Sequence, residues 1–321
     1  MNITTRTALA AVAIVFSLGA VVACGPAAAP NTASNTVNIA CGLGTKKVPV
    51  DWYFPSGTPK GLVWLQHGFT ESKDDWAAFG PKVAAKGYLA MATTLPTADA
   101  FGCTVQNIGN NTAFLNNVAA TFAGLGSTTS AIGKSHADAA AKTGRSGQSL
   151  PQKLAFTGHS AGGEAVLYVA NRLRTSHGST FSKLKGVVVQ DPVKSFVGNN
   201  TDASLQGLNG TSLPIYALAS PKYSCNADQS GTQAVIARLT TRSFHGAQVR
   251  SGAHGDIFGT AQNQLGQITC GTPQAKNTAA TQTLTLGWFG DQFGGTTTEA
   301  FYPGGSTYQG LVSAGTITTL P

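Results

Sequence analysis

Past its first 45 residues, the chain alternates between short apolar runs and longer amphipathic stretches. The runs are almost continuously apolar, a pattern typical of strands that are buried on both faces of a sheet. They occupy residues 61–68, 87–94, 153–159, 186–192, 214–220 and, more weakly, 247–254. Residues 46–54 instead alternate between apolar and polar side chains, which predicts a strand with one face toward solvent.

Helix candidates separate these runs. They place apolar residues at helical spacing, and several end near a glycine. They cover residues 74–87, 111–126, 162–175, 228–241 and 279–295. The repeated order of strand, helix and strand predicts a mostly parallel sheet with helices on both faces and right-handed crossovers.

These patterns divide the chain. We expect one α/β domain over residues 37–295, with surface loops between Cys103 and Gln152, where Gly, Ser and Asn are frequent. Residues 24–36 are rich in Pro, Ala, Ser and Asn and predict a flexible linker. Residues 296–321 are rich in Gly and Thr and predict a tail packed on the surface.

The first residues indicate export. One positive charge, Arg6, precedes an apolar run over 7–23, so residues 1–23 predict a secretory signal peptide, with a membrane anchor as the alternative. Small residues before Cys24 resemble a bacterial lipoprotein signal, in which the new N-terminal cysteine is lipidated. Ordinary cleavage nearby is the alternative. The protein is therefore expected at the cell surface, attached to the membrane through Cys24, or secreted.

The cysteine count agrees with export. Of the five cysteines, four remain once Cys24 is set aside, and four cysteines in an oxidising compartment predict two disulfides. Three connectivities are possible. We favour Cys41–Cys103 and Cys225–Cys270, because each pair lies within one half of the chain.

Composition and charge narrow the possible partners. Of the 321 residues, 42% are apolar and only 11% are charged, against a usual charged share of about 25%. The net charge is +8, but Lys and Arg are scattered and form no stripe interleaved with aromatic residues. We therefore expect a solvated surface and no nucleic-acid partner.

The candidate chemistry centres on residues 156–166, where Ser160 lies between Gly158 and Gly162, after an apolar strand and before a helix. A sharp turn between strand and helix brings the residues two before and two after its centre together, so both must be small. Such a nucleophile elbow lifts the hydroxyl of Ser160 above the edge of the sheet. A glycine-rich helix start with a capping serine is the alternative.

An oxyanion hole is predicted beside it. The N–H of Ala161 lies at a helix N-terminus, which stabilises negative charge. His67 and Gly68 end an earlier strand, so the N–H of Phe69 is expected to point at the same spot. We assign His67 a structural role in that loop.

Six histidines could supply the base that activates the serine. His136 and His177 lie in polar settings, and His159 is expected to point away from the site. In folds with such an elbow the base comes last in chain order. His254, flanked by small residues after the last strand run, is our candidate, and His245 is the alternative.

The base needs a carboxylate to orient it. Asp191 ends a buried strand, where a charge without a partner is costly, and Pro192 stops the strand there. Asp228, in the loop after residues 214–220, is the alternative, and Asp202 lies in a polar loop. Asp256 is close to His254, but one His-x-Asp without further ligands is not a metal site, and we predict none.

These motifs resemble the α/β-hydrolase superfamily. The stretches "WLQHGF", "GHSAGGE", "VVVQDPV" and "SGAHGDIF" occur in its order over about residues 45–295. They are most similar to the group of chlorophyllases, platelet-activating-factor acetylhydrolases, and bacterial lipases and polyester hydrolases. In the first two, the acid directly follows the sixth strand, which implies Asp191. In polyester hydrolases it follows the seventh, which leaves Asp228 open.

The chain also departs from that group. Polyester hydrolases usually have an aromatic residue after the sixth strand and a methionine after the nucleophile, where this chain has Pro192 and Ala161. Phe69 does provide an aromatic residue after the His-Gly pair. The segment between Val193 and Leu213 is short and polar, so we expect an open cleft without a large lid.

The sequence therefore predicts an exported serine hydrolase of carboxylic esters that needs no cofactor. Its substrate would be a small-molecule, lipid or polyester ester. Ser160 would be the nucleophile, His254 the base and Asp191 the acid. Two alternatives remain: an amide or thioester hydrolase with the same residues, and a non-catalytic surface lipoprotein on the same scaffold.

Overall fold

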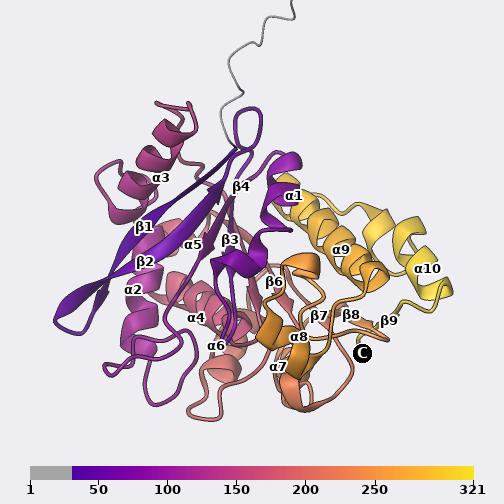
Figure 1. Ribbon diagram of the computed structural model, residues 1–321. Coiled ribbons are helices and arrows are strands. Elements are labelled where there is room, and N and C mark those ends of the chain that lie inside the picture. Colours follow the sequence, from indigo (N-terminus) through magenta and orange to yellow (C-terminus); the bar gives the residue numbers. More distant parts are fainter. Residues whose placement is uncertain (1–30) are drawn as a thin grey trace, which may run out of the picture.

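The computed structural model describes residues 31–321, which are built around one nine-stranded sheet with the order β1-β2-β4-β3-β5-β6-β7-β8-β9 (Figure 1). The six strands from β4 to β8 in this order run parallel, while β1, β2 and β9 pair antiparallel at the two edges. The predicted signal peptide and Cys24 lie outside the described residues. The mostly parallel sheet with helices on both faces is thus confirmed.

The strands and helices have these bounds. The strands are β1 (Thr32–Cys41), β2 (Gly44–Tyr53), β3 (Leu62–Gln66), β4 (Leu89–Thr93), β5 (Leu154–His159), β6 (Leu184–Gln190), β7 (Ile215–Ala219), β8 (Gly246–Val249) and β9 (Ile317–Thr319). The α-helices are α1 (Gly80–Ala85), α2 (Thr112–Ala123), α3 (Ala131–Lys142), α4 (Ala161–Ser176), α5 (Gly178–Phe181), α6 (Asn200–Asn209), α7 (Ser230–Arg238), α8 (Gln264–Cys270), α9 (Ala275–Gly294) and α10 (Ser306–Ser313). The 3₁₀ helices are η1 (Lys73–Trp76), η2 (Ser224–Asn226), η3 (Gly259–Ala261) and η4 (Glu299–Phe301).

Two hydrophobic cores lie on the two faces of the sheet. One face packs against α2, α3, α4, α6 and α7, with side chains such as Phe122 and Val166 in the core. The other packs against α1, α9 and α10 (Figure 1). Trp288 and Leu284 of α9 are fully buried in this second core. Because both faces of the central strands are covered, every residue of β3 and β5 is buried, as their continuous apolar runs predict.

The predicted linker is wrong at its carboxyl end. Residues 32–36 belong to β1, which forms a hairpin with β2 through Gly42 and Leu43. Exposed and buried residues alternate along β1, with Val37 and Ile39 buried. Small polar residues occupy the exposed face, so the segment has the composition of a linker although its pairing with β2 makes it a strand.

The structure corrects three further expectations. The tail over 296–321 contains η4, α10 and β9, and β9 extends the sheet beside β8, so the folded unit continues beyond residue 295. The stretch from Cys103 to Gln152 carries α3 as well as loops. The helix predicted over 74–87 is divided into η1 and α1, because Gly80 and Pro81 begin a new helix, where proline is tolerated.

The register of the parallel strands places five chain segments at one edge. Gln66 at the end of β3 pairs with Gly158 near the end of β5, and His159 pairs with Gln190, the last residue of β6. Gln190 in turn pairs with Leu218, near the end of β7. The loops that follow β3, β5, β6, β7 and β8 therefore meet at this edge, the usual ligand site of an open parallel sheet.

The disulfides join Cys41 to Cys103 and Cys225 to Cys270, which confirms the favoured pairing. The first attaches the β1–β2 hairpin to the loop before α2. The second attaches η2 to the end of α8, across the edge where the five loops meet. Within residues 31–321, no helix has the length and apolar character that crossing a membrane requires.

Candidate active site

Ser160 lies on the turn between β5 and α4 in a backbone conformation that L-residues rarely adopt, with φ 53° and ψ −123°. The turn leaves no space for side chains at its neighbours. A Cβ atom at Gly158 would lie 2.1 Å from the carbonyl oxygen of Gly162, and one at Gly162 would lie 2.3 Å from the carbonyl oxygen of His67. Both glycines are therefore required by sterics, as the nucleophile-elbow interpretation demands.

Backbone hydrogen bonds attach the elbow to the segment after β6. The N–H of Ser160 donates to the carbonyl oxygen of Gln190 at 3.0 Å, and the carbonyl oxygen of Ser160 accepts from Val193 at 3.1 Å. Asp191 lies between these two partners. The serine and the candidate acid are thus held by the same few backbone contacts.

Asp191 follows β6 directly, and its side chain is buried and surrounded by donors. Its carboxylate accepts hydrogen bonds from the N–H of Ser220 at 2.8 Å, the hydroxyl of Ser220 at 2.5 Å and the amide of Asn226 at 3.2 Å. Burial alone would raise the pKa of Asp191, but the hydrogen bonds and charge of His254, together with Ser220, hold that pKa below its ordinary value. Asp191 is therefore a stable carboxylate.

His254 lies in the loop after β8 and is buried beside Asp191. Its Nδ1 is 2.6 Å from Oδ2 of Asp191. Because an ionised carboxylate only accepts, Nδ1 carries the proton, and Nε2 is left to accept one. Among the described residues, neither Nε2 of His254 nor Oγ of Ser160 has a hydrogen-bond partner.

The alternative base and acid have other surroundings. The two ring nitrogens of His245 contact the carbonyl oxygens of Pro321 and Leu239, at 2.6 and 3.1 Å. Asp228 is exposed and follows the 3₁₀ helix η2. The structure therefore brings His254 to Asp191, and neither alternative residue contacts that pair.

The two candidate oxyanion donors come from the expected places. Gly68 packs so closely on the serine that a Cβ there would lie 2.7 Å from Cβ of Ser160, which brings the neighbouring Phe69 to the elbow. The N–H of Phe69 donates to no other group in the described chain. Ala161 is the first residue of α4, where an N–H has no partner within the helix.

His159 and Glu71 have contacts that the sequence did not reveal. The prediction that His159 points away from the site is wrong, because its ring packs against that of His254, and the sequence assigns Glu71 no role. Nδ1 of His159 lies 2.8 Å from Oε2 of Glu71, and Nε2 lies 2.8 Å from the carbonyl oxygen of His254. Sequence spacing carries no sign of a pairing between residues 88 positions apart.

Comparison with known proteins bears on the fold. No family model matches the chain, and no curated protein matches its sequence. Solved structures do match. A ferulic acid esterase from Streptomyces cinnamoneus superposes with a TM-score of 0.56 and 14% identity, covering 93% of this chain and 98% of its own. A dienelactone hydrolase from Anabaena variabilis superposes with a TM-score of 0.51 and 14% identity, covering 81% of this chain and 98% of its own.

A third structure, a dienelactone hydrolase-like promiscuous phosphotriesterase from metagenomic libraries, gives a TM-score of 0.54 at 13% identity, covering 82% of this chain and 99% of its own. The chain has the α/β-hydrolase fold. At these identities the likeness extends to the fold alone, so the narrower group of chlorophyllases and polyester hydrolases stays a prediction.

In this α/β-hydrolase fold, two cavities of very different size lie near Ser160 at the carboxyl edge of the sheet. A cavity of about 370 Å³ lies on the side of the oxyanion donors and is lined mostly by apolar side chains. They include Phe69, Ile108, Ala161, Val193, Phe196 and Val197. The cavity that Asp191 and His254 line holds only about 10 Å³, roughly the space of one water molecule.

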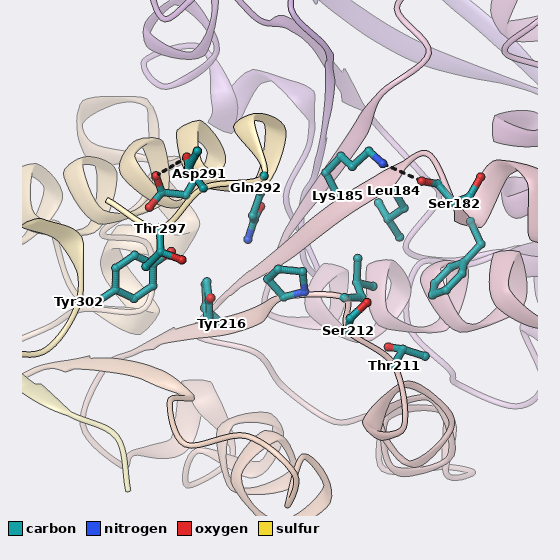
Figure 2. A pocket seen from close by; sticks show the side chains of 15 residues that line it. Ser182, Leu184, Lys185, Thr211, Ser212, Tyr216, Asp291, Gln292, Thr297 and Tyr302 are labelled. Carbon is teal, nitrogen blue, oxygen red and sulfur yellow. Dashed lines mark hydrogen bonds between the residues drawn. The ribbon is translucent and has the colours of Figure 1, made fainter. Parts of the chain in front are cut away.

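A separate cavity of about 370 Å³ lies at the opposite edge of the sheet (Figure 2). Lys185 near the start of β6, Tyr216 of β7 and Gln292 of α9 line it, and Lys185 donates a hydrogen bond to the carbonyl oxygen of Ser182. Because the reacting groups of an α/β-hydrolase fold collect at the carboxyl ends of the strands, this cavity is not part of the candidate active site.

The remaining groups with metal-binding chemistry have other partners. Asp256 accepts hydrogen bonds from the N–H groups of Ala253 and Gln274, and so supports the loop of His254. Within residues 31–321, the one cluster with suitable ligand atoms is formed by Cys41, Asp99 and Cys103, whose two sulfur atoms form a disulfide.

Proposed function

We propose that the protein is a serine hydrolase that cleaves carboxylic esters through an acyl-enzyme. One observation carries the proposal. At the carboxyl edge of the sheet, the buried Asp191–His254 pair leaves Nε2 of His254 without a hydrogen-bond partner among the described residues, and Ser160 lies on a strained elbow at the same edge. A pair of this kind activates a hydroxyl by taking up its proton.

The reaction would proceed in two halves. Oγ of Ser160 attacks the ester carbonyl carbon while Nε2 of His254 takes its proton. The oxyanion that forms accepts hydrogen bonds from the N–H groups of Phe69 and Ala161. The tetrahedral intermediate then expels the alcohol, which receives the proton from His254. Water attacks the acyl-enzyme by the same route and releases the acid and the free serine.

The apolar cavity supports an ester with an apolar acyl group as substrate. It begins at the two oxyanion donors and is bounded by exposed side chains, with Phe196 94% exposed and Ile108 50% exposed. Between Pro192 and Pro214 the only helix is the ten-residue α6, so the cleft is open at the surface. A short or extended acyl chain fits this opening better than a deeply buried long chain.

The test is hydrolysis of p-nitrophenyl butyrate, with labelling by a fluorophosphonate probe. Ser160→Ala is expected to lower kcat by at least ~10³-fold and to abolish labelling. Ser182→Ala is the matched control and should keep both, because it removes an exposed hydroxyl that donates to the carbonyl oxygen of Ser179 and has no other partner within residues 31–321. Wild-type protein that neither turns over esters nor labels would support the non-catalytic alternative. Faster cleavage of matched anilides or thioesters would support the alternative of an amide or thioester hydrolase.

We also propose that the protein is exported and attached to the membrane through Cys24. The two disulfides suit an oxidising compartment. Metabolic labelling with palmitate is expected to mark the wild-type protein and to leave Cys24→Ala unlabelled. Equal labelling of both would contradict the lipid attachment.

A further inference from the structure

A second histidine–carboxylate pair lies directly behind the Asp191–His254 pair. His159 is the last residue of β5 and is fully buried, and the side chain of Glu71 is 6% exposed. Their Nδ1 and Oε2 atoms are 2.8 Å apart. The ring of His159 also packs against that of His254, with 4.3 Å between the ring centroids.

The contacts of this pair reach two loops of the proposed machinery. Oε2 of Glu71 also accepts the N–H of Gly68 at 2.7 Å, and Gly68 precedes Phe69, a candidate oxyanion donor. Nε2 of His159 donates to the carbonyl oxygen of His254 at 2.8 Å. One chain of hydrogen bonds therefore connects the loop that contains Phe69, the end of β5 and the loop that contains His254.

The protonation state follows from the partners. The carbonyl oxygen of His254 can only accept, so Nε2 of His159 carries a proton. Burial alone would lower the pKa of His159, but the charge and hydrogen bond of Glu71 raise it, and the pKa of Glu71 is held below its ordinary value despite burial. Both ring nitrogens of His159 then donate: Nδ1 donates to Oε2 of Glu71, and Nε2 donates to the carbonyl oxygen of His254.

Stability alone is a poor explanation for such a pair. Removing two charges from water costs about as much free energy as their attraction returns, so apolar residues of the same volume would hold a core equally well. The ion pair does provide two directed hydrogen bonds, one from Gly68 to Glu71 and one from His159 to the carbonyl oxygen of His254. These bonds attach two loops whose relative position determines the geometry of the proposed reaction. A misplacement of about 1 Å can slow a reaction ~10²-fold.

We propose that Glu71 and His159 are positioning residues, which hold the loop of Phe69 and the loop of His254 at the separation that the reaction requires. This inference rests on the proposed function of Ser160. Neither residue touches the substrate, so their loss should affect kcat and leave KM largely unchanged.

The sharpest variant is Glu71→Gln, which keeps the shape of the side chain and removes its charge. A neutral His159 carries one proton. If Nδ1 donates it to the amide oxygen, the bond from Nε2 to the carbonyl oxygen of His254 is lost. If the amide NH2 instead donates to Nδ1, it can no longer accept the N–H of Gly68, because one atom of Glu71 takes both contacts, so one link is broken in either case. We expect kcat for p-nitrophenyl butyrate to fall 10- to 100-fold, in line with the cost of misplacement. KM should stay within about threefold, and the rate of fluorophosphonate labelling should fall in parallel. His159→Phe, which keeps the ring, should behave alike.

The double variant and a matched control complete the test. If the two residues act as one unit, Glu71→Gln combined with His159→Phe should be no slower than the slower single variant. Asp75→Asn changes another buried carboxylate of the same segment, whose partners are Ser72 and Asn263. It should keep kcat within about twofold, while Glu71→Asp, which retains the charge, should recover part of the loss.

Two results would overturn the inference while leaving the proposed function intact. One is an active wild type with unchanged kcat in Glu71→Gln. The other is an equal loss of kcat in Asp75→Asn, which would indicate general loosening of the segment. A wild type without esterase activity or labelling would instead refute the proposed function, so the two failures are distinguishable.

Discussion

The two sides of Ser160 differ in almost every physical property. On the side of the base, the side chains of Asp191, His254, His159 and Glu71 are buried, and the cavity that Asp191 and His254 line holds only about 10 Å³. On the other side, a cavity of about 370 Å³ opens between apolar side chains, and Phe196 is almost fully exposed. The dry side strengthens electrostatic interactions and keeps donors in place, while the open side offers apolar surface to a substrate.

The open side is nevertheless held in place by hydrogen bonds to α4. Glu164, in the first turn of α4, accepts hydrogen bonds from the N–H and hydroxyl of Ser195, at 3.1 and 2.5 Å, and from the hydroxyl of Thr201 at 2.5 Å. The hydroxyl of Ser195 in turn accepts the N–H of Asn107 at 2.9 Å. Both walls of the cleft are thus connected to the helix that begins at the elbow, so a rigid frame carries exposed apolar side chains.

The comparison predicts that changes on the dry side act on kcat, and Asp191→Asn should have the largest effect. The variant keeps the size of the side chain but favours the wrong tautomer of His254, because an amide can donate to Nδ1. We expect kcat to fall ~10⁴-fold with little change in KM, in steady-state assays with p-nitrophenyl butyrate. Asp228→Asn is the control and should retain wild-type kcat; a comparable loss there would break the assignment of the acid.

Changes on the open side should act on KM, and Phe196→Ala tests this. Covering about 60 Å² of the ring with an acyl chain is worth about 1.5 kcal/mol. We therefore expect KM for hexanoate to octanoate esters to rise about tenfold, kcat to change little, and acetate to be affected least. Phe101→Ala removes a similarly exposed ring that does not line the cavity. If both variants raised KM equally, the cleft would not be the acyl site.

A further prediction concerns the pH dependence of stability on the dry side, and it leaves catalysis aside. Burial raises the pKa of Asp256 to about 6, above the ordinary value of 3.8. A pKa raised by folding adds stability below the unfolded pKa, and this contribution disappears as pH rises through about 6. Wild type should therefore lose about 2 kcal/mol relative to Asp256→Asn between pH 4 and pH 8, measured by urea unfolding. If the free energy of unfolding of the two proteins varied with pH in the same way, the raised pKa of Asp256 would be contradicted.

Local patterns were enough to predict the centre of the site. Gly158, Ser160 and Gly162 specify a sharp turn because the atoms that would clash lie within a few residues of one another. The end of a buried strand at Asp191 is equally local, since a charge cannot continue an apolar run without a partner. The parallel sheet follows from the repeated order of strands and helices.

Edges and partners could not be predicted in this way. The strand β1 has the composition of a linker, and its conformation depends on pairing with β2. The choice of His254 over His245 depends on contacts between residues 63 positions apart, and the Glu71–His159 pair spans 88 positions. No local pattern encodes such a contact.

The sequence by itself thus determined the alternation of strands and helices in the central fold, the strained turn and the chemical groups available at one edge of the sheet. Only the tertiary structure decided which histidine meets which carboxylate and which side of Ser160 is open. The physical reason is that turns and strands are selected by sterics between neighbours, whereas hydrogen-bonded partners are selected by the packing of the whole sheet.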